Sequence, residues 1–490
     1  MGKVNGFLEY QRKVAEKRDP QERLKDWQEM IIPRSAETTC QQAARCMDCG
    51  IPFCQQGCPL GNLIPDWNDA VYRGDWQRVY QALSATNPLP EFTGRLCPAP
   101  CEASCVLAIN DQAVTIEQIE LEVIEKAFDQ GWVHGKAPTL HKDEKIAVIG
   151  SGPAGLATAI QLNYAGYHVD VYEKDEELGG LLRHGIPDFK LEKWVIDRRI
   201  KIMKQAGIRF FTQCTIGGTD YPWSKMLTDY DAIALCIGAQ KPRDLTISGR
   251  DLHGVHFAMD YLTLQNHKVA HSDVYVAKAD IQAKDKHVVI LGGGDTGADC
   301  LGTALRQGAK HVTQLELMPA PPHTRSSDNL WPQWPLIYRV SSSHEEGGER
   351  QFAFMTEEFI GDDDGHVCAL KGYEISCVKT AQGYQFIRQG EARIIQADLI
   401  LLALGFTQPL INMEAPLSVP LDLQNRLQVD ENFRCGSLPI FAAGDAQRGA
   451  SLIVWVIADG VEMARSIDLY LAQQSHLKTK GLDFSYRIEN

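Results

Sequence analysis

The strongest constraint on the fold is a pattern that occurs twice: an apolar strand, a glycine-rich turn, a helix, and a second strand that ends in an acid. It spans "KIAVIGSGPAGLATAIQLNYAGYHVDVYEK" at 145–174 and "HVVILGGGDTGADCLGTALRQGAKHVTQLEL" at 287–317. In such a turn the first glycine permits the bend, the second admits a pyrophosphate and the third lets the helix pack on the strand. The sequence therefore predicts two dinucleotide-binding βαβ units, with the alternative that one is only structural. Their candidate residues are Gly150, Gly152, Gly155 and Glu173 in the first unit, and Gly292, Gly294, Asp295, Thr296, Gly297 and Glu316 in the second.

A third segment indicates which cofactor the first unit binds. The stretch "LPIFAAGDAQRGASLIVWVIADGVEMA" at 438–464 contains a short apolar strand, the pair Gly444 and Asp445, and an apolar helix. It resembles the closing motif of flavoproteins with two dinucleotide-binding domains, in which the aspartate holds the ribityl or phosphate end of FAD. Gly179 and Gly180 follow the second strand of the first unit. Glycines there would let the chain pass close to a flavin, although an ordinary turn is the alternative.

These segments predict an α/β protein in which a nicotinamide-binding Rossmann-like domain is inserted in an FAD-binding one. The strands at 230–239 and 397–406 resemble the places where such chains cross between domains. The expected division is a helical iron-sulfur domain at 1–140, the first segment of the FAD domain at 141–280, the NAD(P)H domain at 281–395, and the second segment of the FAD domain with the C-terminal tail at 396–490. Residues 318–350, rich in Pro, Trp and Ser, are expected to form an ordered surface excursion or a lid at the nicotinamide site.

Eight of the fourteen cysteines lie before residue 106. Seven of them form two runs, C-x2-C-x4-C-x3-C-P at 46–59 and "CPAPCEASC" at 97–105. Structural zinc takes four ligands and would leave three thiols over, whereas iron-sulfur clusters take thiolates in fours, and the Cys-Pro pair is typical of them. Seven thiols are one ligand short of two clusters. A zinc-stabilised scaffold without enzymatic activity is the alternative.

Glu120 is a candidate for the missing ligand. In the predicted helix at 114–128, Ile116, Ile119, Glu120, Val123, Ile124 and Ala127 share one face. Glu120 is the only acid in this apolar stripe, where a charge is costly unless it is paired or binds metal. An ion pair with Arg45 or Arg95 explains the position equally well.

The motifs together resemble those of the glutamate synthase small-subunit family. They are the two cysteine runs, GSGPAGL, GGGDT and AAGD, and the resemblance covers nearly the whole chain, including the start at 1–27. It implies FAD, NADPH or NADH, and two 4Fe-4S clusters, and a family relative has a non-cysteine ligand at the position of Glu120. By this resemblance one cluster is held by Cys46, Cys49, Cys54 and Cys105, and the other by Cys58, Cys97, Cys101 and Glu120. Cys40 fits neither set.

The resemblance also implies the direction of electron flow. A nicotinamide gives up hydride and clusters accept single electrons, so a flavin must stand between them. The family's glutamate synthesis from glutamine and 2-oxoglutarate belongs to a large (alpha) partner subunit. We therefore expect an electron-input subunit without its own catalytic nucleophile or base. Electron-input subunits of sulfide dehydrogenase or of ferredoxin:NADP oxidoreductases carry a similar module and remain the alternative.

Composition excludes other classes of partner. The formal charge of −14 argues against a nucleic-acid or anionic-membrane surface, which requires a basic excess. No stretch approaches eighteen apolar residues, and the N-terminus has no signal-peptide pattern, so we expect a cytoplasmic protein without a membrane anchor.

The sequence does not decide between NADH and NADPH. Glu316 ends the second strand of the second unit, where an acid binds the ribose 2′-OH and repels a 2′-phosphate. Arg325, in the excursion at 318–350, could instead bind that phosphate.

Overall fold

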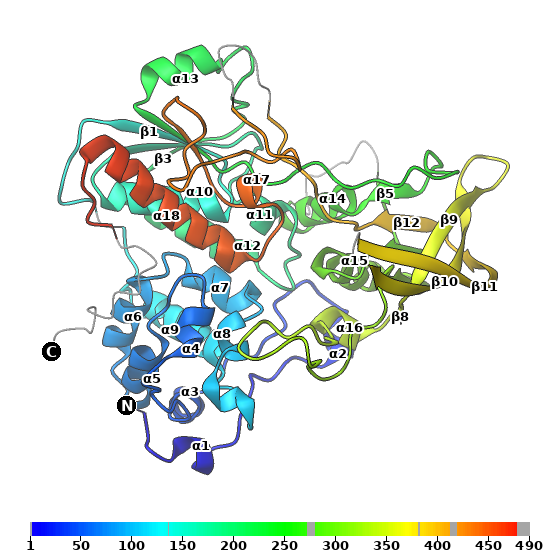
Figure 1. Cartoon of the computed structure of the whole chain (residues 1–490), viewed down its shortest axis with the longest axis horizontal. Coiled ribbons are helices and arrows are strands. Elements are labelled where there is room, and N and C mark those ends of the chain that lie inside the picture. The colour runs from blue at the N-terminus through cyan, green and yellow to red at the C-terminus, as the bar shows by residue number, and fades with distance from the viewer. Residues whose placement is uncertain (1, 136, 272–279, 381–382, 412–418, 478–490) are drawn as a thin grey trace.

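The computed structural model describes residues 2–135, 137–271, 280–380, 383–411 and 419–477. Three units make up the molecule: a helical N-terminal unit, a first dinucleotide-binding unit above it, and a second beside both, as Figure 1 shows. This is the predicted fold class, and the structure confirms it. No described helix is long and apolar enough to cross a membrane.

The first dinucleotide-binding unit is built on a parallel sheet with the strand order β13-β4-β1-β2-β3. Strands such as β1 are apolar runs because both faces of the sheet are covered. Its strands are β1 (Lys145–Ile149), β2 (His168–Tyr172), β3 (Arg209–Phe211), β4 (Ala232–Leu235) and β13 (Ile440–Ala442). Its helices are α10 (Pro153–Tyr164), α11 (Leu181–His184), α12 (Lys193–Gln205), α13 (Trp223–Asp229), α17 (Asp445–Arg448) and α18 (Ile453–Ala472). The long C-terminal helix α18 lies along α10, where Thr158 Oγ1 donates to the Gly460 carbonyl at 3.0 Å.

The second unit repeats this plan with the order β5-β12-β6-β7-β8. Its strands are β5 (Val255–Phe257), β6 (His287–Leu291), β7 (His311–Leu315), β8 (Glu349–Gln351) and β12 (Leu399–Leu402), and its helices are α14 (Ala258–Ala270), α15 (Asp295–Arg306) and α16 (Ser342–Glu346). In both sheets the strand before the glycine turn, β1 or β6, has neighbours reached in opposite directions. Ligands of open α/β sheets bind at such a switch point.

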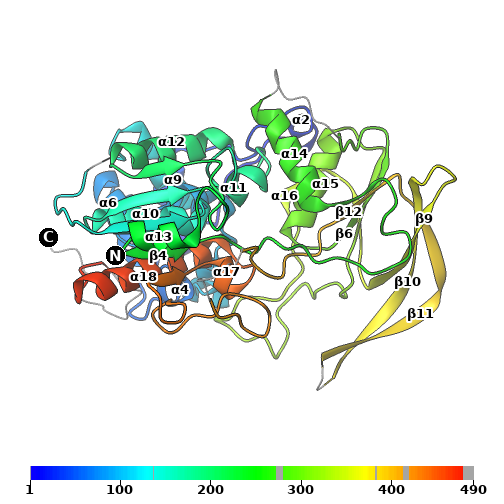
Figure 2. The same ribbon diagram turned by 90° about the horizontal axis from the view of Figure 1, so that it is seen from above.

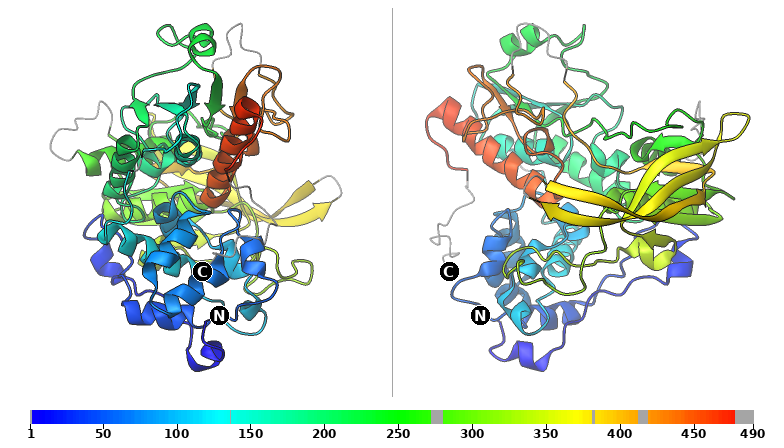
Figure 3. Two further views of the ribbon diagram at one scale, coloured as in Figure 1. Left: turned by 90° about the vertical axis from the view of Figure 1, so that its left-hand side faces the viewer. Right: turned by 45° about the vertical axis from the view of Figure 1, so that its right-hand side comes forward.

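An antiparallel sheet extends from the second unit. It consists of β9 (Phe354–Gly361), β10 (Val367–Thr380) and β11 (Gly383–Gln396) in the order β11-β10-β9. Figures 2 and 3 show that it is the outermost part of the molecule, on the side of the second unit away from the first.

The two dinucleotide-binding units divide at other positions than the expected boundaries at 280/281 and 395/396. Strand β5 and helix α14 precede residue 280 and β12 follows residue 395, yet both strands pair in the second sheet. The chain crosses between units after β4 and after β12, and there the two crossing segments pair through an antiparallel bridge between Pro242 and Phe406. The boundaries shift because sheet membership depends on long-range strand pairing.

The N-terminal unit consists of short helices around a core that includes Trp67, Leu83, Phe92 and Ile119. The helices are α1 (Gly6–Glu9), α2 (Pro20–Arg23), α3 (Ala36–Ala43), α4 (Phe53–Gly57), α5 (Ile64–Tyr72), α6 (Trp76–Ser84), α7 (Pro90–Leu96), α8 (Pro100–Ala103), the 3₁₀ helix η1 (Val106–Ile109) and α9 (Ile116–Asp129). The excursion at 318–350 lies against this unit: Trp331 packs on Phe53 at 4.7 Å between ring centroids, and Ser104 Oγ donates to the Pro332 carbonyl.

Buried charges join the two dinucleotide-binding units. Lys190 of the first unit forms an ion pair with Asp299 on α15, and burial raises the pKa of Asp299 while Lys190 opposes that rise. Asn266 on α14 donates to the carbonyl of His184 at 3.0 Å. These contacts seat the face of the second unit that carries α14 and α15 against the first.

Candidate functional site

The first glycine turn has the backbone that a dinucleotide needs. Gly150 has a φ of +103°, and a Cβ there or on Gly155 would lie closer than 3.0 Å to a backbone carbonyl oxygen. Gly152 differs, because a Cβ on it would meet nothing within 4 Å. The open space beside Gly152, at the N-terminus of α10, is where a pyrophosphate can approach the backbone.

Glu173, at the end of β2, supports this turn. Its Oε2 accepts hydrogen bonds from the Ser151 backbone nitrogen at 3.0 Å and hydroxyl at 2.5 Å, and its Oε1 accepts from the Asp175 nitrogen at 3.1 Å. Ser151 Oγ also accepts from the Gly179 nitrogen at 2.9 Å. A Cβ on Gly180 would lie 3.0 Å from the Gly152 Cα. The chain at Gly179 and Gly180 therefore passes close to the glycine turn, and its expected approach to a flavin stays a prediction.

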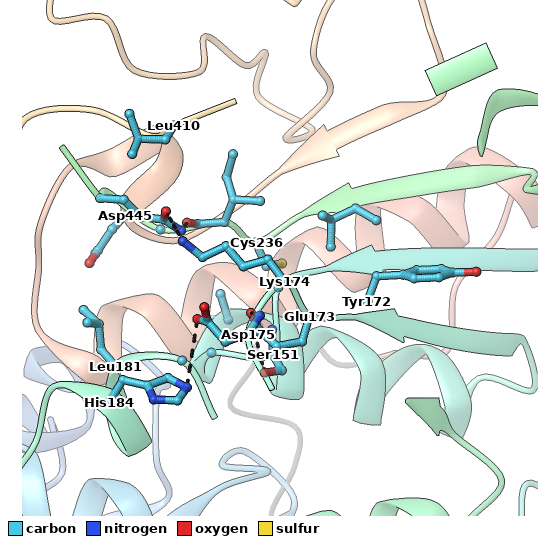
Figure 4. A pocket seen from close by; sticks show the side chains of 18 of the residues that line it. Ser151, Tyr172, Glu173, Lys174, Asp175, Leu181, His184, Cys236, Leu410 and Asp445 are labelled. Carbon is cyan, nitrogen blue, oxygen red and sulfur yellow. Dashed lines mark hydrogen bonds and ion pairs between the residues drawn. The ribbon is translucent and has the colours of Figure 1, made fainter. Parts of the chain in front are cut away.

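A cavity of about 1070 Å³ opens beside the turn. Figure 4 shows Ser151, Glu173, Lys174 and Asp445 around it, with His184 at its edge. Helix α14 of the second unit contributes Met259, Thr263 and His267 to the wall. Ligand pockets commonly measure about 300–1,000 Å³, so this cavity can hold a large ligand.

Asp445 closes the cavity from the C-terminal segment. It is the first residue of α17, and its Oδ1 accepts from the Ser451 nitrogen at 3.1 Å and hydroxyl at 2.9 Å. Burial raises the pKa of Asp445 to about 6, although the Ser451 hydrogen bonds oppose the rise. Gly444, with a φ of +70°, turns the chain between β13 and this residue. The sequence did not single out Ser151 or Ser451, which donate to the two predicted acids, since a serine in or near a turn is an ordinary residue there.

These residues fit an FAD. The turn leaves space for a diphosphate, the cavity is continuous from Gly152 to Asp445, and its wall carries both apolar and polar side chains. The second unit approaches the same cavity through α14.

The second glycine turn has the same skeleton. Gly292 has a φ of +120°, and a Cβ on Gly292 or Gly297 would overlap backbone, whereas Gly294 faces open space. Gly294 and Asp295 are exposed, so this turn is accessible from solvent. Asp295 and Thr296 begin α15. A Cβ on Gly293 would meet the side chain of Glu316 closer than 3.0 Å.

The two residues proposed to distinguish the nicotinamides are not brought together. Glu316 Oε2 accepts from the Gly293 nitrogen, and its Oε1 accepts from the Met318 nitrogen at 3.0 Å. Arg325 donates instead to the carbonyls of Asn329 at 3.4 Å and Ala103 at 3.5 Å. Within the described part of the chain, Arg325 and Glu316 thus have different hydrogen-bond partners.

Four cysteines of the N-terminal unit form one group, which we call the four-thiol group: Cys46, Cys49, Cys54 and Cys105. They line one small cavity together. Burial raises the pKa of Cys46 to about 12, and the neighbouring Cys105 and Cys49 contribute further. The same three thiols contribute to the raised pKa of Cys54.

The other three thiols gather around Glu120, and this set is called the thiol-carboxylate group: Cys58, Cys97, Cys101 and Glu120. Burial raises the pKa of Cys58 to about 11, with a contribution from Glu120. Burial, Cys58 and Cys97 raise the pKa of Cys101, and Glu120 adds to this. Cys40 belongs to neither group, and its thiol donates to the Val71 carbonyl at 3.1 Å.

Glu120 is held by neutral donors. The structure confirms the buried stripe on α9, and Glu120 is 6% exposed. Asn87 Nδ2 donates to its Oε1 at 2.9 Å and Thr93 Oγ1 donates to the same oxygen. Burial raises the pKa of Glu120 to about 7. Asn87 and Thr93 lie before and in α7, and no sequence signal linked them to α9.

The predicted alternative, an ion pair with Arg45 or Arg95, does not form in the described part of the chain. Arg45 donates to the carbonyls of Tyr10, Gln112 and Ala113. Arg95 pairs with Glu29 and Glu125.

The two groups fit iron-sulfur clusters in donor chemistry. Each group has four side chains of ligand type. Burial disfavours the thiolate form of Cys46 and Cys54 in the first group, and of Cys97 and Cys101 in the second. Bound iron would supply the positive charge that makes buried thiols lose their protons.

Comparison with known families matches both halves of this description. A model described as dihydropyrimidine dehydrogenase domain II, 4Fe-4S cluster, matches residues 23–132. A pyridine nucleotide-disulphide oxidoreductase model matches residues 144–460.

Curated relatives match along nearly the whole chain. "Glutamate synthase [NADPH] small chain" of Mycobacterium tuberculosis is 48% identical, covering 97% of this chain and 98% of that protein. The protein of the same name from Bacillus subtilis is 45% identical, covering 97% and 100%. "Glutamate synthase [NADH]" of Schizosaccharomyces pombe is 41% identical over 98% of this chain, but this region is only 23% of that protein.

Among solved structures, FprA of Mycobacterium tuberculosis in complex with NADPH superposes with a TM-score of 0.52. The match covers 68% of this chain and 85% of that chain at 18% identity, and therefore concerns the fold alone.

Proposed function

Because the chain belongs to the glutamate synthase small-chain family, and is thus an NAD(P)H-dependent flavin oxidoreductase with an iron-sulfur domain, we propose that it is the electron-input subunit of a glutamate synthase. It would take hydride from a nicotinamide and deliver single electrons to a large subunit that makes glutamate. The observation that carries this proposal is that seven thiols and the Glu120 carboxyl group fall into two groups of four ligand-type side chains. Glu120 accepts hydrogen bonds from two uncharged side chains in the second group.

The cavity beside the first glycine turn is proposed to bind FAD. FAD, when bound, supplies the conversion between two-electron hydride transfer and one-electron steps. Gly150, Gly152 and Gly155 would shape the pyrophosphate site, with Gly179 and Gly180 passing beside the cofactor. Glu173 keeps the turn in place, and Asp445 would bind the ribityl or phosphate end. With a pKa of about 6, Asp445 is mostly ionised at neutral pH and can accept hydrogen bonds from the cofactor.

The turn of the second unit is proposed to bind the nicotinamide dinucleotide. Gly292, Gly294 and Gly297 would shape the pyrophosphate site, and Asp295 and Thr296 would line it at the start of α15. Glu316 already accepts hydrogen bonds from two backbone nitrogens, so its side chain is less free to turn toward a ribose 2′-OH. The bacterial relatives named above are NADPH enzymes by name. We therefore propose NADPH as the preferred donor, and Arg325 remains a candidate for the 2′-phosphate.

Two 4Fe-4S clusters are proposed for the N-terminal unit, one in the four-thiol group and one in the thiol-carboxylate group. In the second group Glu120 would take the place of a cysteine. Asn87 and Thr93 would orient its carboxylate by holding one oxygen, which leaves the other for iron.

The decisive experiment separates the two halves of the reaction. Purified alone, the chain should oxidise NADPH with an artificial one-electron acceptor and form no glutamate from glutamine and 2-oxoglutarate. Glutamate should form when a glutamate synthase large subunit is added. Glutamate formation by the chain alone, or no complex with that subunit while NADPH oxidation is intact, would contradict the proposal. The second result would favour another electron-accepting partner.

Glu120 can be tested by iron content and EPR. Glu120→Ala should lose or alter one cluster, and Glu120→Cys should restore two clusters with a changed EPR signal. Glu122→Ala is the matched control, because Glu122 lies on the same helix but is held by the Arg34 backbone nitrogen. Two unchanged clusters in Glu120→Ala would show that the carboxylate is structural.

A further inference from the structure

Two histidines and a glutamate meet at the edge of the large cavity. His267 lies in the last turn of α14 and His271 is its C-cap residue, four positions later. Glu177 comes from the segment between β2 and α11. One ligand atom from each of the three side chains lies within 4.8 Å of the other two. His267 and His271 line the cavity proposed for FAD, but the three side chains together have not been given a role there or in the iron-sulfur groups.

The three residues come from different units. Helix α14 belongs to the second unit, whose strand β5 leads into it, whereas Glu177 belongs to the first unit, two positions before Gly179. His267 and His271 both line the cavity beside the first glycine turn. Anything bound by all three side chains would thus tie the second unit to the cavity wall.

Neighbouring groups hold these side chains in orientation. Arg183 Nη1 lies 3.4 Å from Glu177 Oε1, and the other oxygen, Oε2, is 3.2 Å from His271 Nε2. The ring of His184 stacks on that of His267 at 5.3 Å between centroids and 29° between planes. His184 is itself fixed by its Nε2, which lies 3.3 Å from the Glu177 carbonyl oxygen. Such outer contacts orient the ligands of metal sites.

The donor set selects a class of metal. Two histidines four residues apart at a helix end present both rings on one side, and imidazole nitrogen with one carboxylate oxygen suits Zn²⁺ and similar transition metals. Ca²⁺ and Mg²⁺ prefer sites made of oxygen alone. Three protein ligands leave one position of a tetrahedral Zn²⁺ open for water or another ligand.

We propose that Glu177, His267 and His271 bind one divalent transition-metal ion of the Zn²⁺ type, which links the two dinucleotide-binding units at the wall of the large cavity. The site is separate from the cysteine groups and needs neither of them.

To test this, the purified protein with its native cofactors is treated with EDTA and desalted. It is then titrated with Zn²⁺ in a calorimeter. The wild type should bind one equivalent that His271→Ala and Glu177→Gln each weaken by about 100-fold, since even outer contacts of metal ligands are worth about 10- to 100-fold in affinity. His134→Ala is the control, because His134 is an exposed histidine of the N-terminal unit. Zn²⁺ bound to free cysteines would be the same in all four proteins and so cancels.

The flavin spectrum and iron content of each variant establish that it is folded, and His271→Gln replaces His271→Ala if the latter loses FAD. Equal Zn²⁺ isotherms for the wild type and both variants would overturn the site. A loss of affinity in the histidine variant but not in Glu177→Gln would overturn the link between the units. Because metal binding is read without NADPH, these outcomes are independent of the electron-input proposal.

Discussion

The two glycine turns have the same backbone and different surroundings. In both, the first glycine has a positive φ and lies against a backbone carbonyl just after the neighbouring strand, and the third glycine packs on the first. In both, a glutamate accepts a hydrogen bond from the backbone nitrogen of the residue that follows the first glycine. The first turn, however, faces a large cavity shared with α14 and α18, while Gly294 and Asp295 of the second are exposed.

The residues of the two turns also differ. Pro153 begins α10, and Ser151 ties the first turn to Gly179. Asp295 begins α15, and Gly293 has no side chain to make such a tie. Under the proposed function, the shared skeleton would form a diphosphate site in each unit. Under the same proposal, FAD would stay bound in the cavity of the first unit, and the nicotinamide dinucleotide would exchange at the exposed turn of the second.

The largest effect is expected where the skeleton is shared. Gly155→Ala and Gly297→Ala each place a Cβ closer than 3.0 Å to a backbone oxygen of the same turn, which cannot move without displacing a strand. Each should lower the free energy of unfolding by about 3 kcal/mol, at the upper end for overpacking. Thermal unfolding followed by flavin fluorescence and circular dichroism measures this. If Gly155→Ala were as stable as the wild type, the close contact between the third and first glycines would not be a requirement of the turn.

The next effect should separate the turns. A Cβ on Gly152 or Gly294 meets no protein atom within 4 Å, so both alanine variants should fold normally. Gly152→Ala should weaken FAD binding at least about tenfold, which corresponds to about 1.4 kcal/mol. Gly294→Ala should retain FAD and raise the KM for NADPH instead.

FAD content and steady-state kinetics of both variants check this division of roles. Loss of FAD from Gly294→Ala would show that the two turns have been assigned to the wrong cofactors.

An effect of similar size concerns the two glutamates. Glu173→Gln and Glu316→Gln each exchange one acceptor oxygen for an amide donor that faces a backbone nitrogen, so each should cost about 1–3 kcal/mol of stability. Because Glu316 is engaged by Gly293 and Met318, its variant should keep the ratio of kcat/KM for NADPH and NADH close to the wild-type value. A strong shift of that ratio would mean that Glu316 faces the ribose in the complex.

The smallest effect is expected at the residue that differs. Ser151→Gly removes the hydroxyl that bridges Glu173 and Gly179 and should cost about 0.5–1.5 kcal/mol, the usual worth of a hydrogen bond. The reverse change, Gly293→Ser, should bring no gain, because its Cβ would meet the Glu316 carboxylate. Unfolding curves of both variants test this; an equal effect in both would remove the distinction between the turns.

Much of the fold could be predicted because its signals are local. The glycine patterns, the apolar strands and the stripe on α9 are each contained within a short stretch of chain, and all three appear where expected. The membership of β5 and β12 in the second sheet was missed, since a strand of three or four residues carries no local signal for the sheet in which it pairs.

The candidate site divides in the same way. The residue types at the turns and in the cysteine runs were evident from spacing. Their partners were not: Glu120 is held by Asn87 and Thr93 and not by an arginine, and Arg325 contacts the N-terminal unit and not Glu316.

By itself the sequence determined the kinds of chemistry that this chain can carry, because glycine turns and cysteine runs are short motifs whose geometry follows from neighbouring residues. Only the tertiary structure decided which thiols stand together, which cavity two units share, and that Glu177 meets His267 and His271. Those relations join segments that lie far apart in the chain. Hydrophobic burial and strand pairing bring such segments together, and neither leaves a local pattern by which the partners can be identified.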